Sequence, residues 1–239
     1  MLTRPNERVP ALRGELTTLR EVTAADVYTL FTLFSDPAVT EYMAPPPPTL
    51  AKFMGFVVWS HHQRLEGRGL CFGIVPDGMT TAVGILQVRA TDATSSTAEW
   101  GFVLSTHFWS TGVFLDAANL LAEFAFTTLQ IACLEARIAQ RNERAQTAVR
   151  RLGARLETTI QTSSPDGFAR DPEMVWALRE DDWRMRASAN APFPADDLRQ
   201  RLRQAVESAQ TELRRSESPE TVEPYPLFLF DRRRRQQDP

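Results

Sequence analysis

Hydrophobic and polar residues follow a strand period and then a helix period through the middle of the chain. Residues 98–104 read as an apolar strand that runs into a short polar loop and then into a long helical pattern from Gly112. A second strand is predicted over residues 132–139 and a second helix over residues 143–152. This order of strand, loop, helix, strand and helix is typical of a βαβ unit with parallel strands. We expect the remainder of the fold to be arranged around it.

Two amphipathic helices and one strand are predicted ahead of this unit. The strand lies near residues 15–21, and a Thr-x-x-acid cap at Thr23 starts a helix that ends at residues 36–37. The second helix starts after Thr49 and ends at residues 66–67. Its apolar stripe predicts that the helix buries Leu50, Phe53, Met54, Val57, Val58, His61 and Leu65.

Two hairpins complete the predicted sheet. Residues 70–75 and 82–89 are apolar runs separated by a Pro-Asp-Gly turn signal, so we expect an antiparallel pair. Together with the strand at 98–104, this pair is expected at the centre of the sheet. Residues 155–161 and 173–179 are joined by a turn-rich segment and predict a closing hairpin. The predicted fold is therefore a mixed α+β fold with a mostly antiparallel sheet.

The composition of the chain changes beyond Trp183. We therefore expect one domain over residues 1–185 and a C-terminal extension over residues 186–239. Residues 187–194 are predicted as a linker, and residues 196–214 as a helix that either lies along the first domain or pairs with a second subunit in a homodimer. The narrow apolar stripe of this helix is Leu198, Leu202, Ala205, Ala209 and Leu213.

The last residues combine an apolar run with a basic run. Residues 227–230 read Leu-Phe-Leu-Phe, and four arginines follow at 232–235. This tail either docks as an edge strand or is a disordered charged segment. A third hypothesis makes the arginine run a contact with ribosomal or other RNA.

Length, charge and cysteine content narrow the class of protein. The 239 residues fit one large domain with an appendage. A net charge of −3 argues against a general nucleic-acid binder. Cys71 and Cys133 both lie in apolar runs, so neither a disulfide framework nor a metal site is expected. The chain shows no apolar run of membrane-spanning length and no apolar signal core at its start, which favours a cytoplasmic protein without a membrane partner.

Gly112 marks the point where a strand turns sharply into a helix. The first amides of a helix have no partner within the helix, and the helix dipole adds partial positive charge there. Such a turn can hold the phosphate of a nucleotide or of coenzyme A, although a lone glycine is often only a turn.

Two segments together resemble the GNAT N-acetyltransferases, with the RimJ/RimL branch as the closest match. Residues 107–117 read His-Phe-Trp-Ser-Thr-Gly-Val-Phe-Leu-Asp-Ala and are similar to the family's aromatic-Trp-Gly-x-Gly-x-x-x-Glu-Ala loop. Asn142, followed by a helix that ends in Leu152-Gly153, is similar to its second marker. The resemblance runs from Leu16 to Trp183. It implies a GNAT fold, with a splayed parallel strand pair, flanking helices and, in this chain, a helical extension.

The resemblance also implies a reaction, in which an amine attacks the thioester of acetyl-CoA directly, with no metal. In such a site Glu99 accepts a proton through water, or alternatively is only a strand-edge residue facing water. Asn142 would bind the pantetheine arm, or cap a helix, or both. The expected backbone contacts to the coenzyme come from Phe102, Val103, Leu104, Trp109, Ser110, Thr111, Gly112, Val113 and Phe114. The expected contacts to the acceptor come from Tyr42, Met43 and Trp100.

Three positions depart from the family pattern. Ala145 replaces the usual Ser that can protonate the leaving sulfur, Phe114 replaces a small residue, and Ser110 replaces a common glycine. These departures leave open a catalytically silent GNAT-fold binding module. The acceptor amine, whether a peptide N-terminus or a small molecule, also remains open, as does a lining by Glu41, Glu66 and Glu99 that would favour cationic acceptors.

Overall fold

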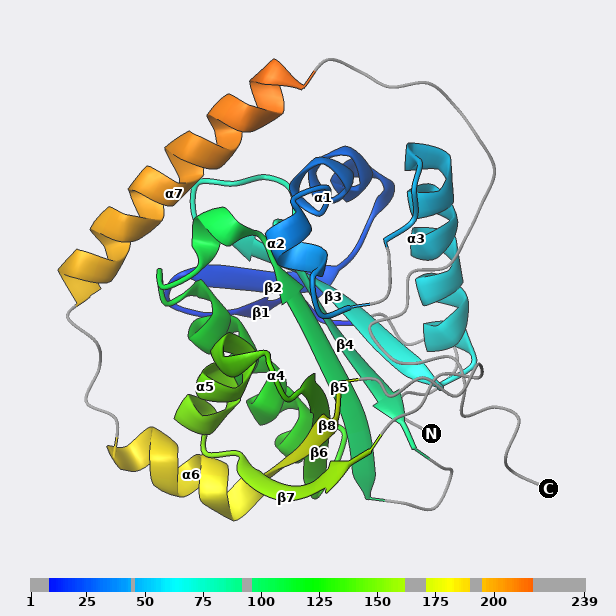
Figure 1. Cartoon of the computed structure of the whole chain (residues 1–239), viewed down its shortest axis with the longest axis vertical. Coiled ribbons are helices and arrows are strands. Elements are labelled where there is room, and N and C mark those ends of the chain that lie inside the picture. Colours follow the sequence, from blue (N-terminus) through cyan, green and yellow to red (C-terminus); the bar gives the residue numbers. More distant parts are fainter. Residues whose placement is uncertain (1–8, 44–45, 92–95, 162–170, 190–194, 217–239) are drawn as a thin grey trace.

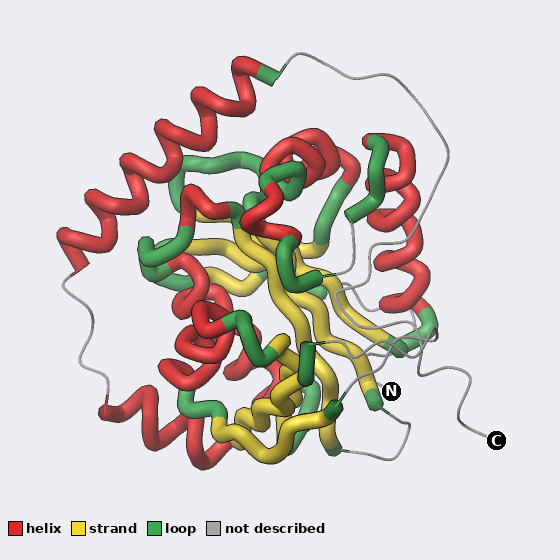
Figure 2. The backbone as a smooth tube through the Cα atoms, in the orientation of Figure 1, coloured by secondary structure: helices red, strands yellow, loops and turns green. Residues whose placement is uncertain are grey.

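The computed structural model describes residues 9–43, 46–91, 96–161, 171–189 and 195–216. Its centre is one sheet of eight strands in the order β1-β2-β3-β4-β5-β6-β8-β7 (Figures 1 and 2). The strands are β1 (Leu12–Arg13), β2 (Thr17–Glu21), β3 (Gly69–Pro76), β4 (Gly84–Ala90), β5 (Thr97–Leu104), β6 (Cys133–Ala139), β7 (Arg155–Ile160) and β8 (Glu173–Arg179). All neighbouring pairs are antiparallel except β5 and β6. The predicted mixed fold, its central hairpin and its parallel pair are confirmed.

Helices cover both faces of this sheet. They are α1 (Val27–Leu33), α2 (Pro37–Thr40), α3 (Leu50–Leu65), α4 (Val113–Thr127), α5 (Glu143–Leu152), α6 (Glu180–Ala189) and α7 (Ala195–Arg215). Successive residues of a strand point to opposite faces. On β2, Thr17 bonds Asp116 of α4, whereas Arg20 bonds Asp26 just before α1. Therefore α4 lies on one face and α1 on the other, where the Phe34 ring after α1 meets Phe53 of α3.

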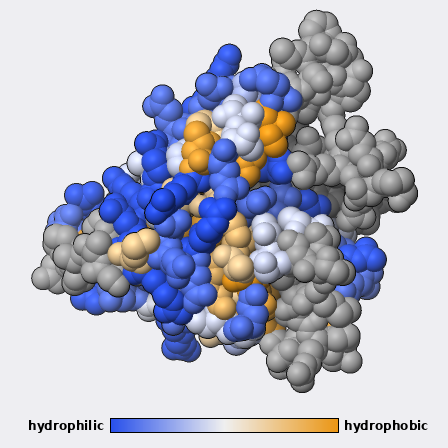
Figure 3. Space-filling view, turned by 90° about the horizontal axis from the view of Figure 1, so that it is seen from below, coloured by the Kyte–Doolittle hydropathy of each residue, from blue (hydrophilic) through white to orange (hydrophobic). Residues whose placement is uncertain are grey.

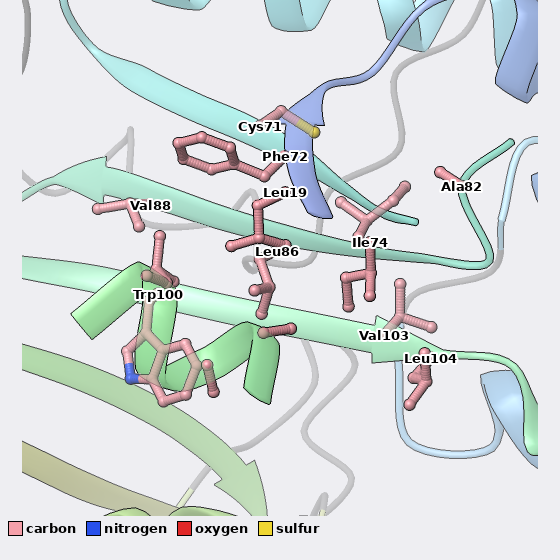
Figure 4. Packing of buried hydrophobic residues seen from close by; sticks show 14 of the residues in the cluster. Leu19, Cys71, Phe72, Ile74, Ala82, Leu86, Val88, Trp100, Val103 and Leu104 are labelled. Atoms are coloured by element: carbon pink, nitrogen blue, oxygen red, sulfur yellow. The ribbon is translucent and has the colours of Figure 1, made fainter. Parts of the chain in front are cut away.

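The core follows the register of the central strands. Leu19 lies opposite Ile74, and Phe72 lies opposite Leu86, so these four side chains share one face (Figure 4). The ring of Phe124 from α4 meets the Phe72 ring edge-on, with 5.9 Å between centroids. This packing fixes α4, and with it the loop that precedes α4, against the middle of the sheet.

The helix α3 buries a different face from the predicted one. Phe53 and Val57 are buried as expected, but Met54 and Val58 are exposed, as is Leu65; Phe56 and Ser60 complete the buried side. The burial of Ser60 is possible because its hydroxyl donates to the Val57 carbonyl, at 2.7 Å. The predicted stripe was wrong at Met54, Val58 and Leu65 because it counted apolar residues alone and did not include the polar Ser60.

The segment after β8 also differs from the prediction. Residues up to Ala189 form α6, so the first part of the predicted linker is helical, and residues 190–194 lie outside the described residues. Acidic residues at 180–182 favour the start of a helix. Trp183 holds α6 in place, because its Nε1 donates to Asn119 Oδ1 at 2.9 Å and its ring packs on Phe126.

The predicted C-terminal helix is confirmed as α7, which runs along one side of the molecule (Figure 1). Its buried residues are Leu202, Ala205, Val206 and Ala209. These side chains are covered by the chain's own domain, so α7 lies along that domain, and pairing with a second subunit stays a prediction. Residues 217–239, with the apolar and arginine runs of the tail, lie outside the described residues, as does the turn at 163–167.

Hydrophilic residues cover most of the described surface seen in Figure 3, and apolar residues gather in patches along its middle. None of the helices in the described part of the chain combines the length and the apolar character that crossing a membrane requires.

Candidate functional site

The parallel strands β5 and β6 separate along their length. Their register covers three residue pairs and ends at Glu99 opposite Glu135. Beyond this point β5 continues to Leu104, while β6 continues to Ala139 and pairs with β8 on its other side. The peptide groups of β5 that face β6 beyond Glu99 therefore lie outside the paired part of the sheet. Backbone groups in such a position need other partners, and an extended ligand chain can provide them.

The loop between β5 and α4 (residues 105–112, the β5–α4 loop) turns through two left-handed residues. Ser110 has φ of 60° and Gly112 has φ of 88°. The helix's first internal bond runs from the Asp116 amide to the Gly112 carbonyl, at 3.0 Å, so the amides before Asp116 have no partner within α4. The buried Thr111 hydroxyl fixes the turn by donating to the Phe108 carbonyl, at 2.7 Å. Two of the amides named from the sequence have partners in the loop itself, since Trp109 N donates to the Thr106 carbonyl at 3.1 Å and Val113 N to Thr111 Oγ1 at 3.4 Å. Binding of an anion at this helix start stays a prediction.

A distant helix supports the back of this loop. A Cβ on Gly112 would lie 3.1 Å from a methyl of Leu16 and 3.1 Å from a methyl of Leu198 on α7. His107 Nε2 lies 3.1 Å from Glu212 Oε2, also on α7. The position therefore suits glycine, because of both the backbone angle and the close packing of α7.

Asp116, at the acidic position of the loop motif, has a structural role. Its carboxylate accepts hydrogen bonds from the amides of Glu15 and Leu16, at 3.1 and 3.0 Å, and from the Thr17 hydroxyl at 2.8 Å. Gly14 passes so close to this carboxylate that a Cβ would lie 2.4 Å from it. Asp116 thus ties the start of α4 to the turn between β1 and β2.

Asn142 caps α5. Its Oδ1 accepts a hydrogen bond from the Ala145 amide at 3.1 Å, so the capping role is confirmed, while a contact with a coenzyme stays a prediction. The buried Gln146 donates to the Gln140 carbonyl at 2.7 Å and closes the turn between β6 and α5. Ala145 carries only a methyl group at the position where the family pattern usually has a serine hydroxyl.

Glu99 lies at the point where the strands separate. Its side chain is buried, with 6% of the residue exposed, so the alternative of a strand-edge carboxylate facing water is wrong. Arg89 Nη2 on β4 lies 2.6 Å from Glu99 Oε2, and Arg137 Nε on β6 lies 3.5 Å from Oε1. Arg137 also lies 3.8 Å from Glu173. We call Arg89, Glu99, Arg137 and Glu173 the vertex cluster. Its ion pairs connect β4, β5, β6 and β8.

The predicted acceptor residues lie in different surroundings. Tyr42 is exposed, and its pKa is raised because its hydroxyl bonds the Glu41 carboxylate. Met43 is half-buried against the core. Trp100 is a core residue on the α4 face, packed on Phe102 with 5.3 Å between ring centroids, and its indole extends from β5 toward β6 (Figure 4). Their contact with an acceptor stays a prediction.

Two of the three glutamates named as a cationic-acceptor lining form ion pairs, and the third, Glu41, accepts a hydrogen bond from the Tyr42 hydroxyl, while the lining itself stays a prediction. Glu99 belongs to the vertex cluster, and Glu66 pairs with Arg68 at 3.4 Å. Among the described residues, no three His, Cys, Asp or Glu side chains lie close enough together to hold a metal ion. Burial raises the thiol pKa of Cys71 to about 12 and of Cys133 to about 11.

Comparison with known proteins now gives the family. Residues 17–155, more than half of the chain, match the model of the acetyltransferase (GNAT) domain. The chain belongs to the GNAT acetyltransferase family. It is therefore an acetyltransferase, as the paired segments at 107–117 and 142–153 predicted.

Relatives of this GNAT protein include proteins of known structure. The uncharacterized N-acetyltransferase p20 of Bacillus licheniformis is 28% identical over 132 residues, which are 55% of this chain and 74% of p20. RimJ of Mycobacterium smegmatis, in complex with a CoA disulfide, has a TM-score of 0.64 at 19% identity and covers 86% of this chain and 97% of its own. The microcin C7 self-immunity acetyltransferase MccE, in complex with acetyl-CoA and AMP, has a TM-score of 0.61 at 18% identity and covers 69% of this chain and 92% of its own. These two structures share the fold, and RimJ is of the branch that the motifs resemble.

Three arginines that contact predicted site residues were not themselves predicted from the sequence. Arg89 lies directly opposite Glu99 in the register of β4 and β5, a pairing that the predicted hairpin of residues 70–75 and 82–89 did not include. Arg137 comes two residues after Glu135, the register partner of Glu99. Arg144, in the first turn of α5, lies with its guanidinium carbon 3.5 Å from the centroid of the Trp109 ring. That contact joins elements far apart in the chain, and no local pattern indicates it.

Proposed function

We propose that this chain transfers an acetyl group from acetyl-CoA to a primary amine, either a protein or peptide N-terminus or a small-molecule amine. The observation that carries the proposal is the separation of β5 from β6 beyond Glu99, next to the turned loop ahead of α4. GNAT membership supports acetyl transfer as the reaction class. MccE with acetyl-CoA, and RimJ with a CoA disulfide, support the choice of donor.

The donor would lie along backbone groups, where side-chain identity matters little. The pantetheine chain would follow the edge of β5 that β6 leaves unpaired, and the Asn142 side chain would bond it from α5. The amides assigned to the diphosphate are those of Trp109, Ser110, Thr111, Gly112, Val113 and Phe114. The amides assigned to the pantetheine arm and to the oxyanion are those of Phe102, Val103 and Leu104.

The proposed chemistry is one direct transfer. The amine nitrogen attacks the thioester carbon, the carbon–nitrogen bond forms, and the carbon–sulfur bond breaks to release the CoA thiolate. The nitrogen must also lose a proton, and Glu99 is its proposed acceptor through water. Ala145 cannot protonate the departing sulfur, so the thiolate leaves without a side-chain acid from that position.

A thiol-release assay tests this function. Full-length protein is incubated with acetyl-CoA and a panel of peptides, amino acids, polyamines and aminoglycosides, and free CoA is followed with a thiol reagent. Calorimetry with acetyl-CoA at millimolar concentration measures donor binding independently. An absence of binding there would remove the enzymatic proposal, whatever the acceptor.

The silent binding module remains a second candidate because of Phe114. Its ring packs on Phe102 with 4.6 Å between centroids, beside the strand edge assigned to pantetheine. A ligand at one hundred times its Kd stabilises the folded state by about 2.7 kcal/mol, so acetyl-CoA must raise the melting temperature if it binds. A melting temperature that acetyl-CoA leaves unchanged, together with a restored shift in Phe114→Ala, would favour the silent module.

A further inference from the structure

Arg144 connects the two sides of the separated strand pair. It belongs to α5, which follows β6, and its guanidinium lies 3.5 Å above the ring of Trp109 in the β5–α4 loop. Trp109 is itself fixed, because its Nε1 donates to the Leu104 carbonyl at the end of β5, at 3.0 Å. The contact therefore lies where the ends of β5 and β6 are no longer paired.

The charge of Arg144 is unusual for its place in a helix. Arg144 is exposed in the first turn of α5, where the helix dipole disfavours a cation. Two other helix arginines have a carboxylate partner one turn away, Arg184 with Glu180 and Arg201 with Asp197. The contact that the structure gives Arg144 is an indole ring instead.

A guanidinium stacked on an indole is well prepared to bind an anion. The flat face of the guanidinium lies against the ring, and its N–H groups point outward in its own plane, where an oxyanion can accept two of them. The nearest candidate for an anion site on this side is the run of amides that follows Trp109, whose own amide donates to the Thr106 carbonyl at 3.1 Å. Both features place positive charge at the same end of the loop.

We propose that Arg144 is a donor-binding residue that contacts the diphosphate of acetyl-CoA, and that Trp109 holds its guanidinium in position. This inference rests on the proposed use of acetyl-CoA. The diphosphate is favoured over the 3′-phosphate because the Trp109 ring that holds Arg144 directly precedes the amides of residues 110–114, which are assigned to the diphosphate.

The experiment compares two positions on one helix. Arg144→Ala and Arg144→Lys are measured beside Arg150→Ala, a matched control in which a guanidinium over Trp176, at 5.5 Å, is removed from the same helix. Calorimetry gives Kd for CoA and for dephospho-CoA, which keeps the diphosphate but lacks the 3′-phosphate. Thiol release from acetyl-pantetheine, which lacks both, serves as the third arm, and melting temperatures report folding.

Arg144→Ala should weaken both CoA and dephospho-CoA about tenfold or more, because a hydrogen-bonded charge contact is lost. Arg144→Lys should recover part of this affinity, since the charge stays but the planar fork is gone. The activity of Arg144→Ala with acetyl-pantetheine should equal that of the wild type. Arg150→Ala should bind CoA as the wild type does. High salt should reduce the difference in CoA affinity between Arg144→Ala and the wild type.

Two results would overturn the assignment. Equal CoA affinity in Arg144→Ala and wild type would remove Arg144 from the site, and a loss confined to CoA, with dephospho-CoA unaffected, would move the contact to the 3′-phosphate. If Arg144→Ala lowers the melting temperature strongly, the Kd values of Arg144→Lys for CoA and dephospho-CoA are compared with those of the wild type instead. Wild-type protein that binds no CoA is a separate outcome, which would end the proposed function and this inference with it.

Discussion

Glu99 carries both a proposed catalytic role and a visible structural one, and Glu99→Gln separates them. The substitution keeps the shape of the side chain and removes the charge that Arg89 and Arg137 share at the vertex cluster. Both guanidiniums then lose a carboxylate partner in a region where the Glu99 side chain is only 8% exposed.

The expected cost follows from this burial. Removing one partner of a buried ion pair costs about 3 to 5 kcal/mol. Arg89 is 31% exposed and Arg137 is 18% exposed, so water offsets part of the loss. We expect Glu99→Gln to lower the free energy of unfolding by about 2 to 3 kcal/mol, which corresponds to about 4 to 12 °C in melting temperature for a chain of this size.

Glu135→Gln is the matched control, since Glu135 lies opposite Glu99 in the register and is only half-buried. Its melting temperature should stay close to that of the wild type. Urea unfolding followed by circular dichroism measures both variants. If Glu99→Gln unfolds at the same urea concentration as the wild type, the vertex cluster does not stabilise the sheet and the reasoning is refuted.

Activity at a temperature where both proteins are folded then addresses catalysis. A general base contributes about a hundredfold or more to the rate, so its loss should lower kcat. The decrease in kcat should be largest for amines of high pKa. A purely structural Glu99 would instead leave kcat nearly unchanged and alter the pH profile little.

Three further predictions concern other residues. The high thiol pKa values of Cys71 and Cys133 predict slow reaction with a thiol reagent at pH 8 in the native protein and fast reaction in denaturant; fast native labelling would contradict their burial. Burial alone would raise the pKa of Asp26, but hydrogen bonds from Arg20 and two backbone amides outweigh it and lower the pKa. Asp26 therefore stabilises the fold above its ordinary pKa of 3.8, and the stabilisation is lost as pH falls through the lowered value. Asp26→Asn should lower the melting temperature at pH 7, with a difference from wild type that shrinks in strong acid; a pH-independent difference would argue otherwise. Gly112→Ala forces a Cβ into the left-handed region at a strain of about 1 to 2 kcal/mol, and should raise the KM for acetyl-CoA more than it lowers kcat, whereas an unchanged KM would separate the loop from donor binding.

Sequence patterns predicted the elements of the fold because their signals are local. The cap at Thr49, the glycine at Gly112 and the apolar runs of β3 and β4 each depend on neighbouring residues. The buried face of α3 was predicted wrongly, since burial of Ser60 depends on a hydrogen bond and on packing against the sheet. Likewise, α6 depends on Trp183 reaching Asn119 across the fold.

The candidate site was predicted less completely than the fold. Motif positions identified the β5–α4 loop and Asn142, since both belong to continuous segments. The partners of Glu99 come from two other strands, and the partner of Trp109 comes from α5, so these contacts exist only after the sheet is assembled. Asp116 was read as part of a motif, yet its hydrogen bonds run to residues about a hundred positions earlier.

The packing of Leu198 against Gly112 has a consequence for synthesis of the protein on the ribosome. Chains are made from the N-terminus, and their parts fold as they emerge. Every strand of the sheet is therefore made before the residue that completes the turn at Gly112. A nascent chain can assemble its sheet while this turn still lacks its last neighbour, so competence to bind a coenzyme should be acquired only after Leu198 has left the ribosome.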